Sequence, residues 1–80
     1  MEPTSLKAAL TRLPFLPFRI HLSDGRNFLI TRPELVFVGG GTTVIGLVRN
    51  SQSEFWDEPV IVANRHMVSL EPVVEESAGA

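Results

Sequence analysis

The sequence predicts a mainly β domain, a small β-barrel of five or six strands preceded by one α-helix. Three observations lead to this fold class. An apolar stripe with helical spacing opens the chain, and several short runs rich in β-branched and aromatic residues follow it. Glycine, proline and aspartate mark tight turns between those runs. Short strands joined by tight turns are typical of small barrels, whose closure removes exposed sheet edges.

Residues 5–13 are expected to form the helix. Their apolar side chains recur at i, i+3, i+4 and i+7 and so line one helical face: Leu6, Ala9, Leu10 and Leu13. Thr4 or Ser5 is expected to cap the first free amides, and Pro14 ends the helix because a residue before proline disfavours helical backbone. A helix this short is unstable alone in water, so its stripe is expected to pack on the β domain.

Residues 18–31 read FRIHLSDGRNFLIT and predict a β-hairpin. A two-residue turn would divide its apolar side chains between the two faces. A three-residue loop closed by Gly25 sets Leu22 opposite Arg26 and gathers them on one face. They are Phe18, Ile20, Leu22, Phe28 and Ile30. We therefore adopt the three-residue loop, which requires a positive φ at Gly25.

Four more strands are expected, at 34–38, 42–48 and 58–63 and from Met67 onward. Residues 39–41 are three glycines, which we interpret as a hairpin turn, since the lysine and the strand–loop–helix context of a phosphate-binding loop are missing. Residues 64–66 leave room only for a tight connection, such as one helical turn. The domain is expected to span residues 1–72, followed by a flexible acidic tail at 73–80.

Length and composition favour self-association. Eighty residues make one domain, and a chain this short buries only about 60% of its unfolded surface. It has no cysteine, so neither disulfides nor thiolate metal sites can add stability. A homo-oligomer is therefore predicted, and the apolar runs at 34–38 and 44–48 have few charges to guard a sheet edge. The sequence shows no membrane span and predicts a cytoplasmic protein without a cofactor.

Charge is distributed unevenly along the chain. Residues 1–53 carry six basic and three acidic side chains, whereas residues 54–80 carry one basic and six acidic side chains. The net charge of −2 lacks the excess of cations typical of strong duplex-DNA binders. A local basic patch for single-stranded nucleic acid remains open.

The chain from residue 5 to residue 71 resembles the Sm-like family, which includes the bacterial RNA chaperone Hfq. The likeness rests on three stretches, namely SLKAALTRL, FRIHLSDGRNF and VIVANRHMVSL. In that family a helix caps a strongly bent five-stranded barrel, and barrels join edge to edge into RNA-binding rings. The resemblance implies the same fold and assembly here, with an SH3-like barrel as the alternative. The opening PF-x-PF-x-I-x-L-x-DGR also resembles short bacterial proteins, a likeness that implies no function.

The functional motifs of the Sm-like family are matched in part. The Asp and Asn that grip uridine are missing from TRPELVFV, and Ala63-Asn64 stands where other members have Arg-Gly. Residues 64–69 read NRHMVS and are similar to the Tyr-Lys-His-x-Ile-Ser motif of Hfq. The resemblance implies that Arg65 and His66 lie at an RNA pocket on the pore side. Asn64 replaces the aromatic residue and so removes its stacking face.

Two other interpretations of the same surface stay open. Arg65 could face solvent or pair with Glu58 or Glu71, while His66 caps the tight turn. The protein would then be a protein-interaction or assembly module that binds no nucleic acid. Phe55 and Trp56 are candidate interface anchors, since aromatic side chains often fill that role.

Catalysis is not expected of this chain. It requires a nucleophile with a base, a carboxylate pair or a metal, arranged around a pocket. The candidate groups are His21, His66, Asp24 and Glu34. Asp24 is accounted for by the hairpin turn, where its side chain bonds nearby backbone. His21 alternates outward on its strand, and a small barrel filled by side chains leaves little room for a substrate.

Overall fold

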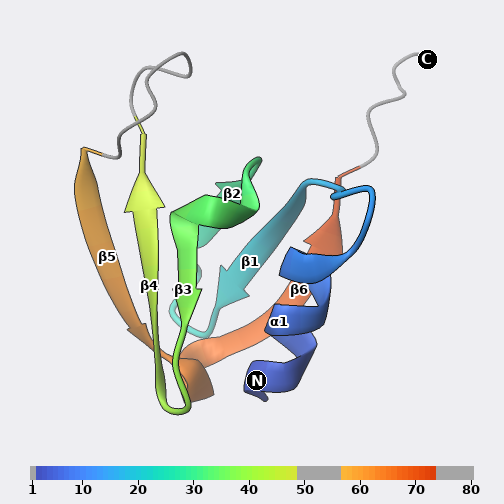
Figure 1. The fold of residues 1–80 in the computed structure, drawn as a ribbon. Helices are drawn as coiled ribbons and strands as arrows, with labels where there is room; N and C mark the ends of the chain where they lie inside the picture. The colour runs from blue at the N-terminus through green and yellow to red at the C-terminus, as the bar shows by residue number, and fades with distance from the viewer. Residues whose placement is uncertain (1, 49–56, 74–80) are drawn as a thin grey trace.

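The computed structural model describes residues 2–48 and 57–73, so the interface candidates Phe55 and Trp56 and the tail from residue 74 lie outside the described residues. Within those ranges, a helix precedes six strands in two three-stranded antiparallel sheets, ordered β2–β1–β6 and β3–β4–β5 (Figure 1). The elements are α1 (Pro3–Thr11), β1 (Phe18–Leu22), β2 (Asn27–Ile30), β3 (Val36–Val38), β4 (Thr42–Leu47), β5 (Glu58–Ala63) and β6 (Met67–Pro72). Two 3₁₀ turns, η1 (Pro33–Leu35) and η2 (Asn64–His66), link them. The mainly β prediction is confirmed, but the strand ladders leave two sheets instead of one closed barrel.

The helix begins and ends two residues earlier than predicted. Glu2 occupies the N-cap position without a side-chain capping bond, so the expected cap by Thr4 or Ser5 is wrong. Pro3 opens the helix, because its fixed φ suits the first turn and its missing N–H would have had no helical partner. The chain is already extended at Arg12, ahead of Pro14.

The predicted apolar stripe of α1 reaches the core with three of its four residues. Leu6 is fully buried, and Ala9 and Leu10 pack against the core at its margin. Leu13 lies beyond the end of the helix and is 90% exposed, so its predicted place in the stripe is wrong. Burial of Leu6 ties the helix to the core that the two sheets share.

The predicted hairpin register is confirmed. Ile20 pairs with Phe28, and the backbone N–H of Leu22 donates to the carbonyl of Arg26 over 2.8 Å. Gly25 has a φ of +94°, a conformation that residues with a β-carbon adopt only at a cost. The five apolar side chains predicted for one face contribute four buried residues and the half-buried Phe28 to the core.

The second sheet differs from the prediction in one strand and in strand order. Pro33 starts the η1 turn, so the third strand is shorter than the predicted 34–38 and begins at Val36. The glycine turn is confirmed, with Gly39 N–H donating to the carbonyl of Thr42 at 2.8 Å. The run 44–48, taken from the sequence as an exposed edge, belongs to β4, which is the central strand of its sheet.

The core lies between the inner faces of the two sheets and under α1. Its buried members are Leu6, Phe18, Ile20, Leu22, Ile30, Val36, Ile45, Val62 and Met67. Every strand contributes to it. Burial along β1 alternates with the period of two that a strand imposes, because successive side chains point to opposite faces.

The 3₁₀ turn η2 carries the chain from one sheet to the other. Figure 1 shows β6 leaving the foot of β5 and crossing toward β1. The prediction of one helical turn at residues 64–66 is confirmed. Because β5 pairs only with β4 and β6 only with β1 in the described residues, both strands next to η2 have one free edge.

Candidate functional site

The NRHMVS segment of the predicted RNA site begins at η2, where Asn64 is the structural anchor. Its side chain is 4% exposed. Its Oδ1 accepts the hydroxyl hydrogen of Thr43 at 2.7 Å, and its Nδ2 donates to the carbonyl of Gly39 at 2.8 Å. Its backbone N–H donates to Gly41 over 2.9 Å. Asn64 therefore fastens η2 to the glycine turn, and these side-chain bonds point into the fold.

Arg65 is exposed at the tip of η2. It lines a shallow open hollow of about 540 Å³ together with Gly40 and Gly41 of the neighbouring turn and with Glu2 and the start of α1. Arginine suits bidentate contact with phosphate, whereas the Glu2 carboxylate in the same hollow opposes a polyanion. The arrangement provides one cation beside exposed glycine backbone.

His66 joins η2 to the β1–β2 turn. Its carbonyl accepts the N–H of Ser23 at 2.8 Å, and its Nδ1 lies 3.3 Å from the Ser23 hydroxyl. The sequence interpretation has His66 capping the tight turn at residues 64–66, whereas these two contacts join it to the β1–β2 turn instead. The three residues of η2 thus lie together but act on different neighbours, with Asn64 facing inward and Arg65 and His66 exposed.

The carboxylates considered as partners of Arg65 lie elsewhere. Glu71 pairs with His21 instead, with Oε1 and Nε2 2.8 Å apart on the outer face of the β2–β1–β6 sheet. Glu58 begins β5, whereas Arg65 follows its end.

Asp24 acts within the hairpin turn, as predicted. Its Oδ1 accepts the backbone N–H of Arg26 at 3.0 Å, and its Oδ2 accepts the Arg26 Nε–H at 2.8 Å. The backbone hydrogen bond, followed by the guanidinium, lowers the pKa of Asp24 below its ordinary value. The Arg26 guanidinium also lies 5.9 Å from the centre of the Phe28 ring, a cation–π distance.

The free edge of β5 is a feature that sequence reasoning missed. Hydrogen-bonded pairs alternate along an antiparallel ladder. The Asn64 N–H donates to the Gly41 carbonyl, so these two residues form a hydrogen-bonded pair. By the alternation, Ile61 and Ala63 belong to non-hydrogen-bonded pairs, and their N–H and C=O groups point away from β4. The Ile61 side chain is 70% exposed. A hollow of about 210 Å³ lies along this edge, between Ile61–Ala63 and the β1–β2 turn.

The free edge of β6 has a similar character. Val73 N–H donates to Pro17, so the alternation along β6 turns the backbone groups of Leu70 away from β1. Val68 on the same strand is 57% exposed. Pro59 and Pro72 lack a backbone N–H, which shortens the stretch of each edge that can pair. The sequence contained a signal for these two edges, since residues 60–63 (VIVA) and 67–70 (MVSL) include no charged residue.

The described residues, 2–48 and 57–73, contain no group of three metal-ligating side chains and no helix long and apolar enough to cross a membrane. No protein-family model, curated protein or solved structure matches the chain. The fold is that of a small mainly β domain with an N-terminal helix and free edges on β5 and β6.

Proposed function

We propose that the protein is a non-enzymatic assembly module, in which the β5 edge of one copy pairs with the β6 edge of the next. The observation that carries the proposal is the pair of free edges on either side of η2, which are uncharged at residues 60–63 and 67–70 and expose Ile61 and Val68. Exposed edges of this kind pair with other strands unless they are guarded. Because the two edges differ, the contact is heterologous and closes into a ring if the rotation permits.

An SH3/Sm-like arrangement is part of this proposal. The element order supports it, since a helix precedes six short strands and the 3₁₀ turn η2 joins the last two. In such an arrangement, β5 and β6 do not pair within one copy. The β5 edge of one copy pairs with the β6 edge of the next.

The test uses the φ of Ala63, which is −69° and already suits proline. Ala63→Pro removes an edge N–H while leaving the internal ladder of β5 intact. We expect the wild type to elute as an oligomer in light scattering and Ala63→Pro and Val68→Lys to give smaller particles. Leu29→Lys, on the edge strand β2, is the matched control and should leave the mass unchanged. A wild type of 8.8 kDa at every concentration would eliminate self-assembly.

Binding of single-stranded RNA is a second candidate function. The observation that favours it is the exposed Arg65 beside Gly40 and Gly41, where a phosphate could reach both the guanidinium and glycine backbone. This function belongs with the Sm-like resemblance, in which Arg65 and His66 contact RNA.

Fluorescence anisotropy with a uridine- or adenine-rich RNA at two salt concentrations tests this candidate. Arg65→Ala should weaken binding and flatten the salt slope by about 0.7, which corresponds to one lost phosphate contact. Lys7→Ala removes the same charge from the exposed face of α1 and is the control. Absence of wild-type binding at low salt rules out RNA and leaves the assembly module.

A further inference from the structure

The outer face of the β3–β4–β5 sheet carries an apolar row that crosses all three strands. The register pairs Phe37 with Val44 and Val44 with Ile61, so the three side chains are neighbours on one face. Phe37 is 61% exposed and Ile61 70% exposed. An aromatic and a β-branched side chain are thus left in water on a sheet whose other face forms the core.

This face is uncharged, and the second sheet provides a contrast. Strand alternation adds Thr42, Pro59, Ala63 and the buried Gly46 to this face, so none of the outward positions within β3, β4 and β5 is charged. The outer face of the β2–β1–β6 sheet is polar, with the Arg19 guanidinium bonded to Asn27 and His21 to Glu71. The outer face of β2–β1–β6 thus carries charged and polar pairs beside the exposed Leu29, whereas the outward positions of β3–β4–β5 carry no charge.

We propose that the outer face of β3–β4–β5 packs against the same face of a second copy to form a two-fold dimer. A face without charges meets itself without like-charge repulsion, and an isologous contact needs only one self-complementary surface. Two sheets pack face to face at about 10 Å through interdigitating side chains. This contact uses side chains that leave the sheet face, whereas the proposed assembly uses backbone groups of the β5 and β6 edges. The two surfaces share Ile61 and Ala63, but the face contact does not require the edge contact.

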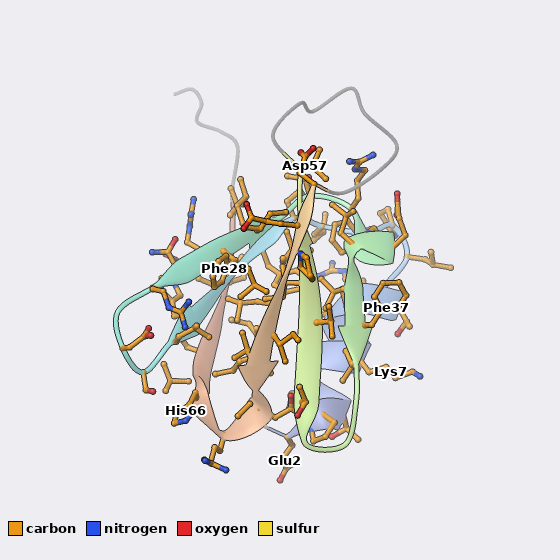
Figure 2. The ribbon with its side chains drawn as sticks, turned by 90° about the vertical axis from the view of Figure 1, so that its left-hand side faces the viewer. Glu2, Lys7, Phe28, Phe37, Asp57 and His66 are labelled. Atoms are coloured by element: carbon orange, nitrogen blue, oxygen red, sulfur yellow. The ribbon has the colours of Figure 1, made fainter. Side chains whose placement is uncertain are left out.

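Charges at the two ends of β5 favour one orientation of the second copy. Asp57 and Glu58 lie at the start of β5, whereas Arg65 follows its end. Figure 2 looks onto this sheet and places Asp57 at one end of β5 and His66 beyond the other. A two-fold axis perpendicular to the strands sets the acidic end of each copy over Arg65 of the other. An axis along the strands would bring like charges together.

The size of the face predicts a weak contact. β4 and β5 are about 20 Å long and β3 is about 10 Å long, so three strands spaced about 4.8 Å apart cover roughly 240 Å² in projection. A standard interface buries about 800 Å² on each partner. The dimer should therefore form at high protein concentration, and it is to be sought from about 10 to 500 µM.

Sedimentation equilibrium of the Ala63→Pro variant, whose β5 edge is weakened, isolates this contact. The apparent mass should rise from 8.8 kDa toward twice that value across the concentration range. Adding Phe37→Lys should weaken the association at least tenfold, whereas adding Leu29→Lys, the same change on the polar sheet, should not. A Phe37→Lys protein that associates like its parent overturns the proposal. Val68→Lys on β6 tests the edge contact without touching this face, and Phe37→Lys tests the face, so the two proposals can fail separately.

Charge reversal tests the orientation. Asp57→Lys and Arg65→Glu should each weaken the dimer, and the double variant should recover at least part of the lost association. Failure to recover overturns the perpendicular axis.

If residues 49–56 cover the face instead, Phe37→Lys lowers the melting temperature without changing the mass. If the face binds another protein, the mass of the isolated chain stays at 8.8 kDa. Either result overturns the dimer.

Discussion

Thr43 and Asn64 hydrogen-bond to each other in the interior, where the Thr43 hydroxyl donates to Asn64 Oδ1 over 2.7 Å. Thr43 is fully buried and Asn64 is 4% exposed. The bond connects the central strand of one sheet to the turn that leads into the other. It places a polar pair at the junction of the two sheets.

Asn64→Ala should therefore destabilise the protein by about 1–3 kcal/mol, because it leaves the Gly39 carbonyl and the Thr43 hydroxyl without their partner. Urea denaturation measures this loss. The adjacent, exposed Arg65→Ala is the control and should stay within about 0.5 kcal/mol of the wild type. Equal midpoints for the two variants would contradict the anchoring role of Asn64.

Gly25→Val should cost about 1–3 kcal/mol because φ is +94° at this position. A β-carbon at Gly25 would meet no heavy atom within 4 Å, so the cost comes from the backbone conformation and not from a clash. Gly25→Asn should cost less, since asparagine adopts positive φ more readily. Thermal melts that show Val and Asn to be equally harmless would contradict this explanation.

Gly39→Ala and Gly40→Ala should differ, although the two glycines are adjacent in one turn. A β-carbon on Gly39 would lie 2.6 Å from the Thr42 carbonyl oxygen, so the turn would have to shift. A β-carbon on Gly40 meets nothing within 4 Å, and neither residue has a positive φ. Thermal denaturation should show a lower melting temperature for Gly39→Ala and an unchanged or slightly higher one for Gly40→Ala. Equal losses would show that the close approach at Gly39 does not matter.

Asp24 should give a pH-dependent contribution to stability. Its pKa is lowered in the folded state by the Arg26 N–H and then by the guanidinium, so its contribution is present above the unfolded pKa of about 4. The contribution is lost as the pH falls through the folded pKa. Asp24→Asn keeps a turn acceptor but removes the charge. The difference in melting temperature between the wild type and Asp24→Asn should shrink from pH 7 toward pH 2, and a constant difference would contradict the assignment.

The hairpin could be predicted because its information is local. The turn composition and the alternation around it selected one register, and the structure has Ile20 opposite Phe28 as that register requires. The position of β4 could not be predicted in this way. Its run of apolar residues suits an edge or a centre equally, and only the pairing with β3 and β5 decides.

The corner at residues 64–66 shows the same division for the site. One helical turn followed from its length, whereas the burial of Asn64 depends on the glycine turn 25 residues earlier. The resemblance of residues 64–69 to the Hfq motif assigned Asn64, Arg65 and His66 to one RNA pocket. Their different surroundings could be found only once the two sheets were placed against each other.

The turn η2 is attached to the glycine turn at residues 39–41 and to the β1–β2 turn, and this constrains the order in which the chain folds. Its contacts join residues 25 and 43 positions apart, and β6 contacts β1 over 50 positions. Hairpins such as β1–β2 and β3–β4 close over short loops and form quickly, whereas contacts over long separations form slowly. A nascent chain that has not yet released residues 64–72 from the ribosome lacks the contacts through which η2 and β6 join the two hairpins. Of the described strands, β6 emerges last, and its Met67 completes the core.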